Sequence, residues 1–71
     1  MSEEITKGES KEVKSHDSFV IAEDGTLSFE GLSCEILDNA GSRVGPVGNG
    51  SSKTVSKGMK CYVQQGKVTL R

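Results

Sequence analysis

Eight of the nine glycines lie between Gly25 and Gly66, and they separate short runs in which apolar and polar residues alternate. Alternation with a period of two is typical of strands that bury one face, and closely spaced glycines favour turns between strands. No segment shows a convincing helical period. The sequence therefore predicts an all-β fold: a small barrel or two-sheet sandwich of six or seven short, mostly antiparallel strands.

The length of the chain limits its core. The 71 residues suffice for one domain, and only 16 of them are Leu, Ile, Val or Phe, with no Trp. A domain of this size leaves roughly 40% of its unfolded-chain surface exposed after folding. We expect modest stability for the isolated chain, or support from a partner subunit.

Residues 1–17 differ in composition from the rest of the chain. They carry eight charged side chains and three apolar ones, Met1, Ile5 and Val13. So few apolar groups cannot offset the entropy lost when a segment of this length is ordered. We expect a flexible acidic N-terminal arm over 1–17, alternatively an arm that orders on binding, ahead of a compact β-domain over 18–71.

Two hairpins are expected at the ends of the β-domain. Asp24-Gly25 suits a type I′ turn, and Gln65-Gly66 occupies the matching place near the C-terminus. The two segments also align as a weak repeat, which reflects either duplication or, as we favour, the similarity of any two amphipathic hairpins. The expected strand pairs are 19–23 with 26–30, and 59–64 with 67–71.

The segment between the hairpins is expected to be extended and irregular. Pro46 lacks an amide donor, so 42–47 is predicted to be an edge strand or an irregular segment. The rest is read as a turn at 38–41, a loop at 48–52 and a short strand at 53–57.

Both cysteines fall in the apolar phase of their strands. Cys34 alternates with Leu32 and Ile36, and Cys61 is in phase with Val63. We expect all of these side chains to face the core, and both thiols to be reduced. With no C-x-x-C pattern and no second pair, neither a disulfide framework nor a structural zinc site is indicated.

The net charge of −1 conceals an uneven distribution. Residues 1–38 hold ten acidic and three basic side chains, whereas residues 39–71 hold six basic side chains and no carboxylate side chain. In the expected C-terminal hairpin Lys60 faces Arg71, and like charges in this position destabilise a sheet unless negative charge lies nearby. The candidate interaction surface is Arg43, Lys53, Lys57, Lys60, Tyr62, Lys67 and Arg71.

Three sources can supply the negative charge. In order of preference they are acidic side chains of the same sheet, the acidic arm of a neighbouring copy, and an acidic partner protein or polyanion. Nucleic acid is not favoured, because the aromatic side chains that stack on bases are scarce.

Three stretches resemble motifs without meeting their requirements. Residues 45–54 lack the lysine that directly follows the second glycine of a phosphate loop, and Asn49-Gly50-Ser51 matches a glycosylation pattern without a secretory signal. His16-Asp17-Ser18 are consecutive and so cannot form a hydrolytic relay. A metal site built from His16, Cys34 and Cys61 lacks a fourth ligand. We expect no catalytic residue, no metal and no cofactor.

These features favour a non-enzymatic structural or assembly protein that contacts neighbouring subunits through its arm and polar β-surface. The expected partner is a second copy or another protein, and a small accessory protein of a virus particle is one setting, by analogy. The alternative is a small binding or inhibitor module whose basic C-terminal half occupies an acidic or nucleic-acid-binding surface of a target. An acidic start and no long apolar run favour the cytoplasm, or a particle assembled there, without membrane contact.

Overall fold

The computed structural model describes residues 3–71, which form seven strands and no helix. These strands belong to one sheet, in which β1 and β3 run parallel and the other pairs are antiparallel. The predicted all-β fold of mostly antiparallel strands is therefore confirmed. The strands are β1 (Glu3–Ile5), β2 (Ser10–Val13), β3 (Asp17–Ile21), β4 (Gly25–Leu37), β5 (Arg43–Pro46), β6 (Ser51–Val55) and β7 (Lys60–Leu70).

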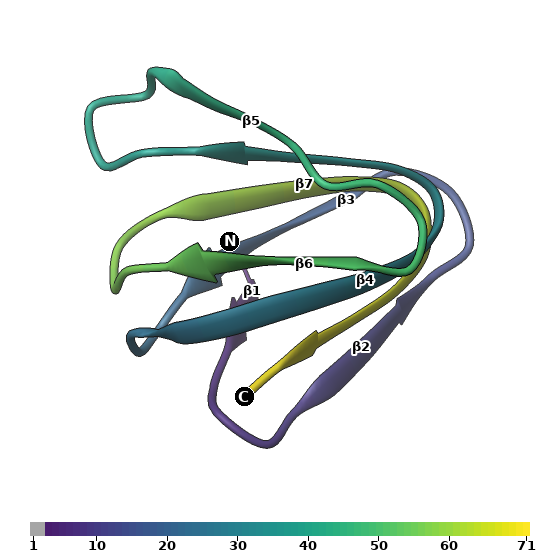
Figure 1. Ribbon diagram of the computed structural model, residues 1–71, viewed down its shortest axis with the longest axis horizontal. Coiled ribbons are helices and arrows are strands. Elements are labelled where there is room, and N and C mark those ends of the chain that lie inside the picture. The colour runs from purple at the N-terminus through teal and green to yellow at the C-terminus, as the bar shows by residue number, and fades with distance from the viewer. Residues whose placement is uncertain (1–2) are drawn as a thin grey trace.

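The two longest strands, β4 and β7, pair along almost their whole length and form the centre of the sheet. β5 and β6 follow one another along the outer side of β4, and β3 and β2 do the same along β7. β4 and β7 both bend at one end of the molecule, and the chain from β5 to β6 and the chain from β2 to β3 turn at the same end (Figure 1). The sheet therefore folds over on itself, and its two halves face each other across the core.

Two glycines allow the central strands to bend. Gly31 and Gly66 are register partners, with φ angles of 153° and 144°. A Cβ added to Gly66 would collide with the carbonyl oxygen of Glu30 and stand 2.8 Å from the ring of Phe29. Glycine in a strand commonly marks such a tight corner, and an aromatic ring packed over it restores the lost contact area.

A bulge in β4 lies beside this bend. The register shifts between Gly31 and Ser33, and the intervening Leu32 is 67% exposed. The prediction that Leu32 faces the core is therefore wrong, because the extra residue in the bulge breaks the alternation. Asn49 Oδ1 accepts the N–H of Gly31 at 2.9 Å, so the connection between β5 and β6 is tied to the bulge by a side chain.

Neither expected hairpin forms. β3 pairs with β1 and β7 and not with β4, while Gln65-Gly66 lies inside the continuous strand β7. The Asp24 carboxylate accepts the Lys57 N–H at 2.7 Å, which ties the β3–β4 connection to the β6–β7 turn. Glycine with a positive φ occurs at bends within a strand as well as at turns between strands. The sequence around Gly66 was therefore wrongly interpreted as a hairpin turn. The weak repeat is therefore not a pair of hairpins.

Several local predictions are confirmed. Cys34 and Cys61 both face the core and are buried. β5, which contains Pro46, pairs with β4 alone and is an edge strand. The turn after β4 is closed by Asp38, whose Oδ1 accepts the N–H groups of Ala40 and Ser42 at 2.9 and 2.8 Å.

The expected arm over 1–17 is the largest correction. Within the described residues, β1 pairs with β3 and β2 pairs with β7, and the side chains of Ile5 and Val13 are 0% and 5% exposed. Few apolar residues suffice here because both of them reach the shared core. Residues 3–17 are thus part of the β-domain, which spans 3–71; residues 1 and 2 of the expected arm lie outside the described residues.

The turn between β1 and β2 is held by Thr6 and Glu9. Glu9 Oε1 accepts both the hydroxyl and the N–H of Thr6, at 2.7 and 2.9 Å, and these bonds lower the pKa of the Glu9 carboxyl. The main chain then joins the end of β7, where the Gly8 N–H donates to the Leu70 carbonyl at 2.7 Å. This turn carries the chain from the edge of one half of the sheet to the other.

The core lies between the two halves of the folded sheet and contains no polar or charged buried side chain among residues 3–71. Phe19 and Phe29 are its largest members. Its members come from every described strand except β5: Ile5, Val13, Phe19, Ile21, Leu27, Phe29, Cys34, Ile36, Val47, Val55, Cys61, Val63, Val68 and Leu70, with Val47 just after β5.

The bend predicts that Gly66→Ala lowers the free energy of unfolding by about 2 kcal/mol or more, because the new Cβ collides with β4 and the φ angle disfavours alanine. The matched control is Gly48→Ala, where no positive φ is required and the nearest atom, Ser51 Oγ, is 3.4 Å away. That change should alter the free energy by no more than about 0.5 kcal/mol. Urea unfolding followed by circular dichroism measures both, and equal effects would contradict the proposed role of the bend.

The burial of β1 predicts that Ile5→Ala destabilises the domain by about 2–5 kcal/mol, the range for deleting a fully buried aliphatic side chain. Glu4→Ala, on the same strand but exposed, is the control and should be nearly neutral. A neutral Ile5→Ala in the same urea titration would show that the N-terminal segment is the independent arm that its composition suggests.

Candidate interaction surface

Three of the seven predicted surface residues lie together on the outer face of one half of the sheet. Along β7 the side chains alternate, so Lys60 and Tyr62 are exposed while Cys61 and Val63 are buried. Leu37 of β4 is the register partner of both Lys60 and Arg43, and Glu35 is the partner of Tyr62. Register partners share a face of the sheet, which places these groups side by side. We call this surface the Tyr62 face: Ser18, Val20, Glu35, Leu37, Arg43, Lys60 and Tyr62.

The other four predicted residues lie elsewhere. Lys67 is on the second half of β7, where Glu12 and Glu30 are its register partners on either side. Lys60 and Arg71 lie at opposite ends of β7 and do not face each other, contrary to the expectation from the hairpin. Arg71 pairs through its main chain with Thr26, at 2.8 and 2.9 Å.

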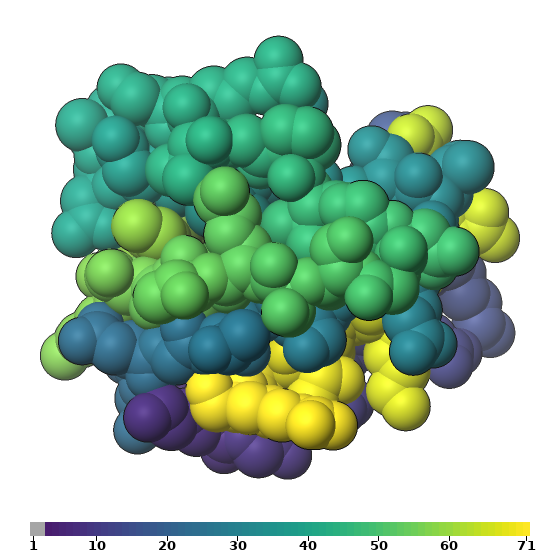
Figure 2. All heavy atoms as spheres, in the orientation of Figure 1, coloured from purple at the N-terminus to yellow at the C-terminus, as the bar shows by residue number. Residues whose placement is uncertain are grey.

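Lys53 and Lys57 belong to the β6 edge of the sheet. Lys53 is the register partner of the buried Leu27 and is itself half-buried, so it sits on the core side of this edge strand. Lys57 is exposed in the turn before β7. In the space-filling view β6 crosses the front of the molecule, between the segment that contains β5 and the C-terminal end of β7 (Figure 2).

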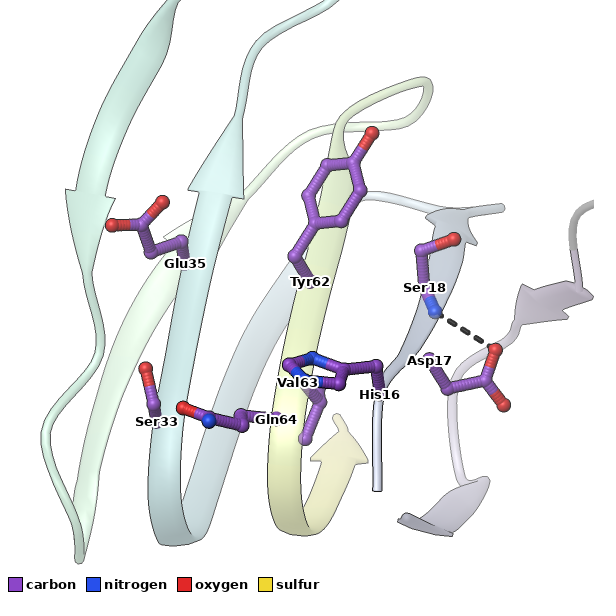
Figure 3. A pocket seen from close by; sticks show the side chains of 8 residues that line it. All are labelled: His16, Asp17, Ser18, Ser33, Glu35, Tyr62, Val63 and Gln64. Carbon is purple, nitrogen blue, oxygen red and sulfur yellow. Dashed lines mark hydrogen bonds between the residues drawn. The ribbon is translucent and has the colours of Figure 1, made fainter. Parts of the chain in front are cut away.

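A shallow hollow of about 510 Å³ adjoins Tyr62 on the outer face. Tyr62 stands up from β7, with Ser18 on the strand to one side and the side chain of Glu35 on the other (Figure 3). The small side chains Ser18 and Ser33 leave the space that the ring does not fill. The hollow is lined by His16, Asp17, Ser18, Ser33, Glu35, Tyr62, Val63 and Gln64.

The Tyr62 face carries both signs of charge. Arg43 contacts Glu35 at 2.7 Å, and both side chains are substantially exposed, so this ion pair contributes at most about 1 kcal/mol. Lys60 has only the apolar Val20 and Leu37 as register partners. Lys60 is therefore a cation with no carboxylate opposite it in the sheet. The nearby carboxylate of Glu35 is already partly neutralised by Arg43.

The apolar part of this face is larger than the sequence pattern suggested. Tyr62 is 45% exposed, and Val20 and Leu37 beside it are half-buried although they point outward. The distribution of charged residues along the sequence identified Tyr62, Arg43 and Lys60. It gave no indication of their apolar neighbours. The available signal was the phase of Val20 and Leu37, which alternate with the inward-facing Ile21 and Ile36.

The chemistry-bearing side chains do not converge on one point. His16 lines the outer hollow, whereas Cys34 and Cys61 lie in the core on the other side of the sheet. Within residues 3–71, no group of three His, Cys, Asp or Glu side chains is arranged to hold a metal ion. The same range contains no helix long and apolar enough to cross a membrane.

The Tyr62 face is thus an outward, partly apolar surface that carries both signs of charge. Comparisons of the chain with protein-family models, with characterised proteins and with solved structures found no match.

Proposed function

We propose that this protein is a non-enzymatic assembly protein that binds a second copy of itself through the Tyr62 face. The observation that carries the proposal is the half-exposed Tyr62 ring, which stands beside an open hollow on the outer side of the sheet. Tyrosine and arginine surrounded by aliphatic groups are enriched at the centres of protein interfaces. This face has that composition, with Arg43, Leu37 and Val20 around Tyr62.

A second copy fits the face because the projecting and receding parts are adjacent. In a two-fold contact the same patch of both copies meets, so each copy must supply both a projection and a recess. Tyr62 is the projection, and the space beside Ser18 and Ser33 is the recess. In such a contact we expect Lys60 of one copy to lie near Glu35 of the other, which would give the lysine the carboxylate that its own sheet does not place opposite it.

The size of the domain supports the same proposal. Among residues 3–71 the core contains 14 buried apolar residues, and small domains commonly gain stability from association. The contact is assigned to the sheet surface and not to residues 3–13, because those residues already pair within their own sheet. A small accessory protein of a virus particle is one example of an assembly protein of this kind.

The alternative function, a module that uses a basic surface to bind an acidic target, has weaker support. Lys67 lies between two register-paired glutamates, and Arg43 contacts Glu35. Two of the six basic side chains of residues 39–71 therefore lie beside carboxylates of their own sheet, which is the first of the three sources considered above.

The Tyr62 face predicts that Tyr62→Ala and Lys60→Glu each weaken self-association at least about tenfold, in line with the loss of an interface anchor. Sedimentation equilibrium over a concentration series measures the dissociation constant, with circular dichroism as the folding control. The matched control is Lys67→Glu, which makes the same charge change on the same strand but outside the face, and should leave association unchanged.

A salt series separates the ionic contribution of Lys60 to self-association from the apolar contribution of Tyr62. Raising the salt concentration should reduce the effect of Lys60→Glu, because exposed ionic contacts are screened beyond about 10 Å at 0.1 M salt. The effect of Tyr62→Ala should persist. A wild-type chain that stays monomeric at all accessible concentrations would overturn self-assembly, and salt-sensitive binding of that monomer to a polyanion would favour the alternative module.

A further inference from the structure

Cys34 and Cys61 form a contact pair inside the core. Their sulfur atoms are 3.3 Å apart, and the two residues are 1% and 0% exposed. Each belongs to one of the two central strands, Cys34 to β4 and Cys61 to β7. The core needs two small apolar side chains here, but packing alone does not require that both be thiols in contact.

The register explains how the two thiols meet. Cys34 is opposite Val63, and Cys61 is opposite Ile36, so the cysteines are diagonal neighbours across the β4–β7 pair. The register shifts between Ser33 and Cys34, where the bulge ends. Diagonal neighbours normally contact each other only through long side chains, yet here the two short side chains place their sulfur atoms 3.3 Å apart. The sulfurs need to approach by about 1.2 Å to reach the length of a disulfide bond.

We propose that Cys34 and Cys61 are an oxidative modification site, at which a hydroperoxide converts the two thiols into a disulfide that links β4 to β7 inside the intact fold. This inference is independent of the proposed assembly function, because it concerns the inner side of the sheet and not the Tyr62 face.

The reaction balances with hydrogen peroxide as the oxidant. The Cys34 thiolate attacks one peroxide oxygen, the O–O bond breaks, and Cys34 becomes a sulfenic acid as the departing hydroxide takes a proton and leaves as water. Cys61 sulfur then attacks the Cys34 sulfur and displaces the sulfenic oxygen as a second water, which carries away the Cys61 proton. Two electrons pass from the thiols to the peroxide, and two waters form.

The hydrogen bond between the thiols divides these roles. Stabilisation by Cys61 lowers the pKa of Cys34, against the opposing effect of burial, whereas the same bond and burial raise the pKa of Cys61. The thiolate is the nucleophile, so whichever sulfur loses its proton first attacks the peroxide, and the direction of these pKa shifts favours Cys34. Cys61 keeps its proton until the second step.

Burial controls the rate of this reaction. Neither sulfur is open to solvent, so peroxide reaches the pair only when the sheet opens locally. The oxidation should therefore be slow, and the product should resist reduction for the same reason. The resulting cross-link closes a loop from 34 to 61 that contains β5 and β6, the strands along the outer edge of β4.

The experiment treats the native 71-residue protein with hydrogen peroxide and follows its intact mass. We expect a monomer that has lost two hydrogens, regains them with dithiothreitol, and yields a single cross-linked peptide containing Cys34 and Cys61 after digestion. The circular dichroism spectrum should not change, and the urea midpoint should rise on oxidation and fall back on reduction.

Two variants test whether both thiols are required. Cys61→Ala and Cys34→Ala each lack the second sulfur, so neither should lose two hydrogens or yield the internal cross-link under the same exposure. If either variant fails to fold, the mass and peptide map of the wild-type protein still decide.

Three results would overturn the proposal. One is a native protein that stays unreacted under conditions that oxidise the urea-unfolded chain, which would make the pair an inert part of the core. Another is the gain of oxygen atoms on Cys34 or Cys61, or the formation of covalent dimers, in place of the internal cross-link; the peptide map separates these oxygens from the sulfoxides that peroxide also forms on Met1 and Met59. The third is an oxidised protein with a lower urea midpoint, which would show that the cross-link distorts the fold.

Discussion

The pairing of β4 with β7 is the constraint on which the rest of the structure depends. The ladder runs from Leu27–Leu70 to Leu37–Lys60 and bends where Gly31 meets Gly66. Without this bend the two halves of the sheet could not face each other, and a chain with so little apolar material would have no enclosed core. The neighbouring strands follow the same bend along both sides of the central pair (Figure 1).

The alternation of apolar residues was sufficient to predict the all-β class and the inward cysteines, and the missing amide donor of Pro46 was sufficient to predict an edge or irregular position for its segment. It was not sufficient to predict which strands pair, because Gly66 has the same sequence appearance in a bent strand as in a hairpin turn. The N-terminal segment was misjudged for a related reason. Its composition counts only two aliphatic residues in the described part, yet Ile5 and Val13 are both placed in the shared core by partners that are distant in sequence.

The Tyr62 face was predictable in part. The charge distribution drew attention to Arg43, Lys60 and Tyr62, but the same reasoning added Lys67, which the register places between Glu12 and Glu30. Register depends on the bulges at Leu32 and beyond Ile36, and neither has a sequence signal of its own. The contact between the two cysteine sulfurs was invisible for the same reason, since it arises from a diagonal across two strands.

The half-buried Lys53 on the core side of β6 has a consequence for how copies of this protein can meet. An open strand edge invites another strand to add to it, and the addition can repeat without end to give fibrils. A neighbouring chain that extended the sheet beyond β6 would have to cover the amine of Lys53, and beyond β5 it would meet Pro46, which offers no N–H. Both obstacles lie on the same side of β4. Growth by strand addition is thereby hindered along this edge, while the outer face of the sheet stays open to a contact that closes after two copies.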